Sequence, residues 1–165
     1  MDPIDPATAH ARREVRIREV RAGDEAAITR LLADLDVGSR YLRWFTGGVD
    51  VRQAADWASH PERSSAVGLL AIVGEELVGH AVLVPVPDGR GEVAFEVAAA
   101  WRHQGIAGAL LQRLIDVAAA RGLHELCADV LPANADMLAV LREHGEHTES
   151  RDGGILTVTL PVQAD

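Results

Sequence analysis

The sequence has 165 residues, of which 48% are apolar, and its formal net charge is −9. This length fits one domain built around one hydrophobic core. Binding to nucleic acid or to an anionic membrane surface needs clustered Lys and Arg, so the acidic balance argues against both. It is compatible with a cationic partner, although solubility also accounts for it.

The chain contains a single cysteine, Cys127, so no intramolecular disulfide can form, which is typical of an intracellular setting. The N-terminus is acidic and contains proline, and it lacks the apolar segment of a signal peptide. No apolar run approaches the roughly 18 residues that would span a bilayer. We therefore expect a cytoplasmic protein with no membrane association, in which residues 1–13 form a flexible tail and residues 14–165 a single domain.

The first part of the domain is predicted to form one strand and two helices. Asp24 follows Gly23 and is suited to cap the first helix. The first helix carries a stripe of apolar residues on one face, and His60-Pro61 ends the second. In chain order the elements are a strand over 15–20, a helix over 25–35 and a short helix over 51–59.

The remainder is predicted to alternate strands with two long helices. Gly122 and Gly145 are suited to end these helices, and the turn residues Gly74-Glu75-Glu76 join the first two strands. The predicted elements are strands over 67–73, 77–84 and 92–98, a helix over 105–120, a strand over 123–130, a helix reaching about residue 144 and a strand over 155–160. This order predicts an α+β fold with a mixed sheet and two crossover units at the C-terminal end.

The segment over 92–108 carries the strongest functional signal. A strand passes through a short connection directly into a helix whose first turn is small and contains glycine. Backbone N–H groups at a helix N-terminus lack intrahelical partners and, with the helix dipole, form an anion site. Small residues let a pyrophosphate approach closely, and Arg102 and His103 lie beside it. The motifs of P-loop and dinucleotide-binding proteins are absent.

The run Arg102-His103-Gln104-Gly105-Ile106-Ala107 resembles the Gln/Arg-x-x-Gly-x-Gly/Ala signature of the GNAT N-acetyltransferase family. A second region is also similar, because the strand over 123–130 is followed by Asn134, Met137, Leu141 and Gly145. The resemblance covers about residues 14–162. It implies a GNAT fold with a central mixed sheet of six to seven strands, splayed middle strands and about four flanking helices.

The resemblance further implies acetyl-CoA as the cofactor. Its pantetheine arm would lie where the strands over 92–98 and 123–130 splay apart. Main-chain groups near Glu96 and Val97 would pair with the pantetheine amides and polarise the thioester carbonyl. Asn134 would hydrogen-bond the arm, and it is also suited to cap its own helix. The residues implied to hold the pyrophosphate are Arg102, His103, Gln104, Gly105, Ile106, Ala107 and Gly108.

Acetyl transfer requires a neutral acceptor amine, and removing a proton from a lysine-like amine at pH 7 costs roughly 4.6 kcal/mol. A nearby base would offset part of this cost. Glu92 is our candidate, because its position corresponds to a glutamate in histone and bacterial protein lysine acetyltransferases. Glu96, on the same face of the strand, is the competing candidate. Each is also explained as an exposed or ion-paired strand carboxylate.

Two positions depart from the family pattern. Many members place a tyrosine seven residues after the motif asparagine as a general acid, whereas this chain has Leu141 there. Its single tyrosine, Tyr41, is far away in sequence. A thiol with a pKa near 8.5 leaves tolerably well without a strong acid, and water could protonate it. Glu146 stands where an aromatic residue usually follows the motif glycine.

The segment over 39–45, Ser-Arg-Tyr-Leu-Arg-Trp-Phe, resembles one in bacterial protein lysine acetyltransferases of the Pat type. We therefore expect the side-chain amine of protein lysine as the acceptor. The alternatives are a small amine, such as a polyamine, an amino acid or an antibiotic, and an acyl-CoA-binding module without turnover. His144 and His147 are close, but no ligand cluster accompanies them, so we expect no metal. A homodimer is compatible with the resemblance.

Overall fold

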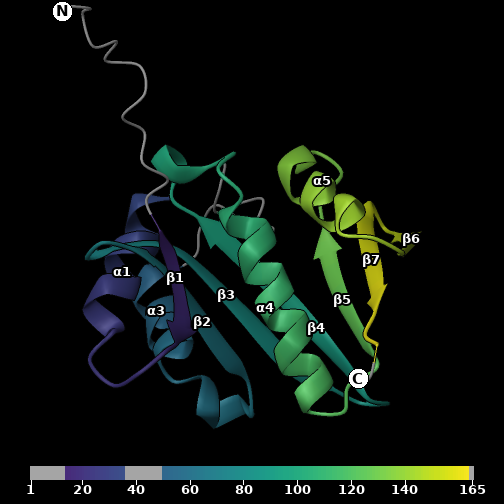
Figure 1. Ribbon diagram of the computed structural model, residues 1–165, viewed down its shortest axis with the longest axis horizontal. Coiled ribbons are helices and arrows are strands. Elements are labelled where there is room, and N and C mark those ends of the chain that lie inside the picture. The colour runs from purple at the N-terminus through teal and green to yellow at the C-terminus, as the bar shows by residue number, and fades with distance from the viewer. Residues whose placement is uncertain (1–13, 36–49, 164–165) are drawn as a thin grey trace, which may run out of the picture.

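The computed structural model describes residues 14–35 and 50–163 and shows a seven-stranded mixed sheet flanked by helices (Figure 1). Predictions for the tail over 1–13, and for Tyr41 and the segment over 39–45, lie outside the described residues. The strands are β1 (Val15–Glu19), β2 (Val67–Val73), β3 (Glu76–Val86), β4 (Arg90–Val97), β5 (Glu125–Val130), β6 (Thr148–Asp152) and β7 (Ile155–Pro161). The α-helices of the described residues are α1 (Glu25–Asp34), α3 (Val51–Ser59), α4 (Ile106–Ala120) and α5 (Ala135–Glu143).

The strand order is β1-β2-β3-β4-β5-β7-β6, and only β4 and β5 run parallel. A parallel connection needs a crossover, which α4 supplies between these two strands. They pair only at their beginnings, with Glu92 opposite Cys127 as the last pair, and then diverge (Figure 1). The predicted α+β architecture with splayed middle strands is therefore confirmed.

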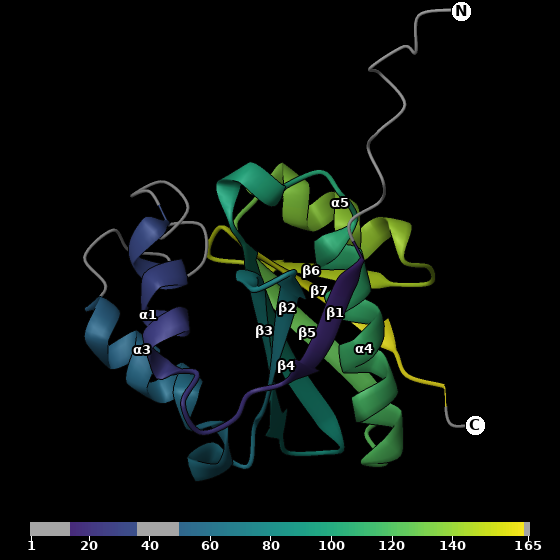
Figure 2. The ribbon, with the colours of Figure 1, turned by 60° about the vertical axis from the view of Figure 1, so that its left-hand side comes forward.

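Helices cover both faces of the sheet, with α1 and α3 on one face and α4 on the other (Figure 2). The larger core lies on the α4 face, where Leu110, Leu111 and Leu114 are fully buried against the strands. A smaller core packs the apolar stripe of α1 and the small residues of α3 against Leu70 and Ile72 of β2. In the part of the chain that the structure describes, no helix is long and apolar enough to cross a membrane.

Two local features differ from the sequence-based expectations. Asp24 does not cap α1 with its side chain. Its carboxylate instead accepts two hydrogen bonds of 2.8 Å from the Arg18 guanidinium and one of 2.7 Å from the Arg21 backbone. Charge-assisted bonds of this kind are stronger than a neutral cap.

The second difference is that β5 begins at Glu125 and not at residue 123. The Leu123 N–H closes the end of α4 by donating to the Ala118 carbonyl, while Gly122 adopts a φ of +73°. This is the backbone arrangement that commonly ends a helix at glycine, and it holds Leu123 out of the strand.

Candidate active site

A cleft of about 1580 Å³ opens where β4 and β5 separate. It is lined by the first turn of α4, by β4, β5 and α5, and on the remaining side by α1 and α3. Most of the predicted site residues line it: Glu92, Glu96, Val97, Arg102, His103, Gly105, Ile106, Ala107, Gly108 and Asn134. Gln104 is not among the lining residues, and its side-chain amide donates to the Ala100 carbonyl at 3.2 Å.

The N-terminus of α4 is open toward this cleft. Gly105 precedes the helix with a φ of +82°, and no side chain caps the end. The first intrahelical bond runs from the Ala109 N–H to the Gly105 carbonyl, so the N–H groups of Ile106, Ala107 and Gly108 have no acceptor within the helix. A Cβ atom added at Gly105 would meet nothing within 4 Å. This end can therefore receive an anion at the positive pole of a 15-residue helix.

The main chain of β4 alternates between its two neighbouring strands. The Gly89 and Gly91 carbonyls point to the β5 side, where they accept from the His124 N–H and the Cys127 thiol. The Ala98 N–H points the other way and donates to Val78 of β3. Because the pairing of β3 with β4 has no register shift, odd-numbered residues of β4 face β5 and even-numbered ones face β3.

Beyond the pair of Glu92 and Cys127 no strand partner remains on the β5 side, so the main-chain groups of Phe95 and Val97 face the gap. The Val97 carbonyl also accepts from Arg102 Nε at 3.2 Å. The main chain of Glu96 belongs to the ladder with β3. Val97 therefore presents its main chain to the gap, whereas Glu96 pairs with β3, and the cofactor contacts expected near these two residues stay a prediction.

The side chains of Glu92, Ala94 and Glu96 lie on the face of β4 that is turned toward α1 and α3. Glu92 is exposed at the vertex of the gap, opposite Cys127. Burial, and then the nearby Glu92 carboxylate, raise the pKa of the Cys127 thiol. Cys127 is half-buried and lines the cleft.

Glu96 is buried and is bonded to a residue that sequence reasoning missed. Oε1 of Glu96 lies 2.8 Å from Nδ1 of His80 on β3, its direct cross-strand partner. The local sequence around His80 carries no signal for this pairing. Only the register of the β3–β4 hairpin, set by the turn over 87–89, brings the two side chains together.

Asn134 caps α5, because its side-chain oxygen accepts from the Met137 N–H at 3.3 Å. It also lines the cleft, so the capping role is confirmed and the cofactor contact stays a prediction. Leu141, at the position where family members often carry tyrosine, is fully buried. Its side chain supports the core and offers no proton to the cleft.

Charge in the cleft is unequally distributed. Among the described lining residues the acidic ones are Asp50, Glu92, Glu96, Asp129, Asp136 and Glu143, whereas Arg102 is the one arginine. Arg102 lies at the α4 end, where His103 also approaches Asp136 at 3.6 Å across the gap. The opposite end, near α3, carries Trp57, whose exposed fraction is 40%.

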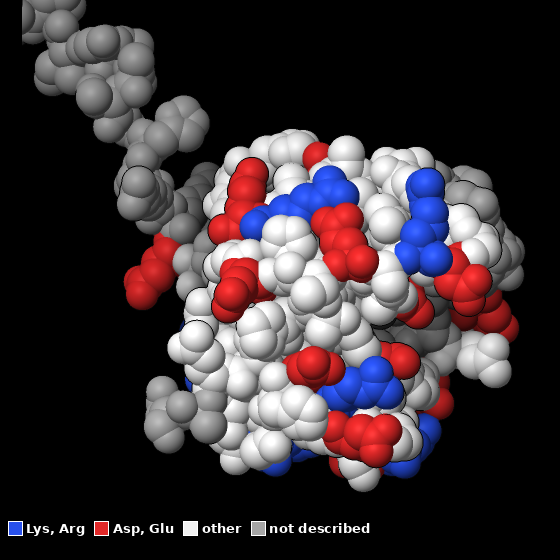
Figure 3. Space-filling view, turned by 90° about the vertical axis from the view of Figure 1, so that its right-hand side faces the viewer, with Lys and Arg blue, Asp and Glu red and all other residues white. Residues whose placement is uncertain are grey.

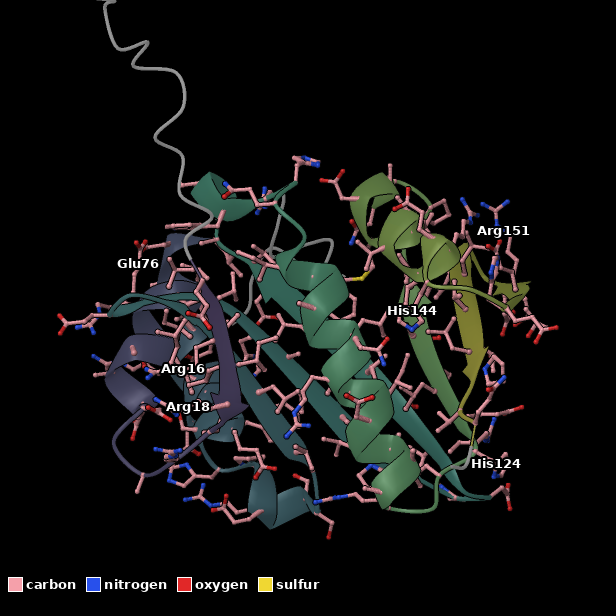
Figure 4. All side chains as sticks on the ribbon, viewed as in Figure 1. Arg16, Arg18, Glu76, His124, His144 and Arg151 are labelled. Atoms are coloured by element: carbon pink, nitrogen blue, oxygen red, sulfur yellow. The ribbon has the colours of Figure 1, made fainter. Side chains whose placement is uncertain are left out.

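Acidic and basic side chains are interspersed on the face that carries β6 and β7 (Figure 3). Arg16 and Arg18 on β1 and Arg151 on β6 lie at opposite edges of the sheet (Figure 4).

Comparison with known proteins identifies a family and several structures with the same fold. The chain matches the model of the acetyltransferase (GNAT) family over residues 30–145, and no curated protein matches it. The GNAT domain of S. lividans PAT superposes with a TM-score of 0.81 at 26% identity, over 89% of this chain and 90% of that one.

Two further solved structures share the fold. A ribosomal-protein-alanine N-acetyltransferase from Brucella melitensis has a TM-score of 0.72 at 25% identity, over 88% of this chain and 99% of that one. A putative acetyltransferase from Salmonella typhimurium, determined with its cofactor acetyl-CoA, has a TM-score of 0.74 at 21% identity, over 90% and 94% of the two chains.

Proposed function

This chain belongs to the acetyltransferase (GNAT) family, whose members are enzymes that use acetyl-CoA, and we propose that its acceptor is the side-chain amine of a protein lysine. The observation that carries the proposal is the acidic lining of the cleft, to which Asp50, Glu92 and Asp129 contribute together with the exposed Trp57. Carboxylates attract an ammonium group, and an aromatic face favours a nearby cation. The sequence resemblance over 39–45 and the structural likeness to the PAT domain point the same way.

The residues present fit acetyl-CoA. The open N-terminus of α4, with Arg102 beside it, would hold the pyrophosphate. The free main-chain edge at Phe95 and Val97 would pair with the amides of the pantetheine arm as an additional strand would. Acetyl-CoA supplies an activated thioester, and a main-chain N–H on this edge would stabilise negative charge on its carbonyl oxygen.

Glu92 would accept the proton that the ammonium must lose before it can attack. It lies on the acceptor face of β4 and is exposed, so it can return the proton to solvent. The reaction would proceed by direct attack with both substrates bound. Because Leu141 is buried in the core, the departing thiolate would take its proton from water.

The acceptor class is tested by measuring kcat/KM with acetyl-CoA for a lysine-containing peptide and for polyamines, amino acids and aminoglycosides. The chain contains no lysine, so a label found on lysine must lie on the substrate. We expect the peptide to give the highest kcat/KM, and Glu92→Gln to lower kcat and alter its dependence on pH.

Two results would contradict the proposal. If small amines alone were acetylated, the acceptor would be a small molecule. If acetyl-CoA bound but no amine were acetylated, the chain would be a binding module without turnover. A Trp57→Ala variant adds a finer test, because it should raise KM for the peptide several-fold while the KM for acetyl-CoA stays the same.

A further inference from the structure

His80 and Glu96 form a buried pair of titratable side chains beside the cleft. Their Nδ1 and Oε1 atoms are 2.8 Å apart, and the exposed fractions of the two side chains are 2% and 5%. Both residues line the cleft. The other ring nitrogen of His80, Nε2, is buried and has no hydrogen-bond partner.

The fold does not require this pair. Its neighbours on the same face of the sheet are apolar. Leu70 of β2 pairs with His80, and the next residues on this face are Val82 of β3 and Ala94 of β4. Burying ionisable groups here, and leaving one nitrogen without a partner, lowers stability relative to an apolar pair. Such costs concentrate at functional sites.

The hydrogen bond fixes how His80 can act. An ionised carboxylate only accepts hydrogen bonds, so Nδ1 must carry the hydrogen that it donates to Glu96. The neutral imidazole then keeps its basic lone pair on Nε2. Glu96 is thereby a positioning residue, and it also stabilises the imidazolium that forms when Nε2 takes a proton.

Acetylation of an ammonium requires two protons to leave the nitrogen, one before the attack and one after it. Glu92 and Glu96 stand four residues apart on one face of β4, about 13 Å between their Cα atoms at a rise of about 3.3 Å per residue. The small side chain of Ala94 lies between them. A nitrogen bound above Ala94 would therefore have a proton acceptor on each side.

Resting on the proposed acetyl transfer, we propose that Nε2 of His80 accepts the second proton from the acceptor nitrogen. Glu92 first takes one proton from the ammonium. The nitrogen–carbon bond then forms, the second proton passes to Nε2, and the carbon–sulfur bond breaks with its electron pair on sulfur. The thiolate takes a proton from water. Glu92 returns its proton to solvent, and His80 returns its proton through the cleft once the product has left, so one net proton is released.

Other charged and titratable groups line the same cleft. Among the described residues they are Asp50 before α3, Glu92 on β4, Arg102 and His103 before α4, Cys127 and Asp129 on β5, and Asp136, Glu143 and His144 at α5. The lining residues of α1, Leu32 and Leu35, are apolar, as is Leu70 of β2.

The test compares His80→Gln and Glu96→Gln with wild type over a range of pH, using a lysine peptide. His60→Gln is the matched control, because His60 contacts the Asp56 carbonyl outside the cleft. We expect His80→Gln to lower kcat about 100-fold, as loss of an acid–base group commonly does, and to remove one ionisation from the low-pH limb. Glu96→Gln should lower kcat by a smaller factor, and His60→Gln should leave kcat unchanged. The KM for acetyl-CoA should stay unchanged throughout.

A second readout does not depend on turnover. Imidazole ¹⁵N chemical shifts in the wild-type protein should show hydrogen on Nδ1 of His80 and a lone pair on Nε2 at the pH of activity, and Glu96→Gln should disturb this state. Hydrogen on Nε2 at that pH would overturn the inference even if His80→Gln failed to fold. If the wild type is active and His80→Gln has the same kcat, this inference alone is refuted. If the wild type is inactive, the proposed function is refuted.

Discussion

The open N-terminus of α4 gives the sharpest prediction, because Gly105 can be changed without crowding. A side chain there points into free space, so the cost of Gly105→Ala comes from its φ of +82° alone. This conformation costs a residue with a Cβ atom about 1–2 kcal/mol. Gly105→Glu has the same backbone cost and adds a negative charge at the proposed pyrophosphate site.

The difference between the two variants therefore isolates the charge. A carboxylate about 6 Å from one phosphate charge, at an effective dielectric constant near 20, is repelled by about 2.8 kcal/mol. This corresponds to a roughly hundredfold weaker Kd. Calorimetric titration with acetyl-CoA should give a Kd for Gly105→Glu that is larger than the Kd for Gly105→Ala by this factor. The ratio of the two Kd values should become smaller at high salt. Equal Kd values for the two variants would refute the placement of the pyrophosphate.

Three other predictions concern stability and reactivity. Asn134→Ala removes the cap of α5 and should lower the free energy of unfolding by about 1 kcal/mol, measured by urea denaturation; no loss would contradict the capping role. The Arg18 hydrogen bonds lower the pKa of Asp24, so its stabilisation is present above the ordinary carboxyl range and is lost as pH falls through the lowered value. Asp24→Asn should therefore lower the free energy of unfolding at neutral pH, and the difference from the wild type should become smaller as the pH is lowered. The Cys127 thiol, whose raised pKa keeps it neutral near pH 7, should alkylate slowly, and Glu92→Gln should speed this reaction; an unchanged rate would show that the two groups do not interact.

The periodic parts of the fold could be predicted from sequence because burial imposes a period. The α4 stripe that includes Leu110 and Leu114 has the helical spacing, and the alternation of Glu92, Ala94 and Glu96 has the strand spacing. The uncapped start of α4 was also predictable, since a strand leading into a glycine-containing helix start is a local pattern. The start of β5, which depends on how Leu123 closes the end of α4, was placed less accurately.

The parts that escaped prediction depend on pairing between distant residues. The bond between His80 and Glu96 requires the register of a hairpin, which a single strand sequence does not specify. The orientation of the Glu96 main chain toward β3 depends on the same register. Asp24 has the residue type of a cap, but the position of Arg18 on β1 decides what its carboxylate binds.

The most direct test of the central claim is a single incubation of the wild-type protein with acetyl-CoA and a lysine-containing peptide, followed by fragment-ion mass spectrometry of the peptide. We predict one acetyl group on the lysine Nζ, with CoA released in equal amount. Release of no CoA and an unmodified peptide, under conditions in which acetyl-CoA is bound, would contradict the claim that this chain acetylates protein lysine.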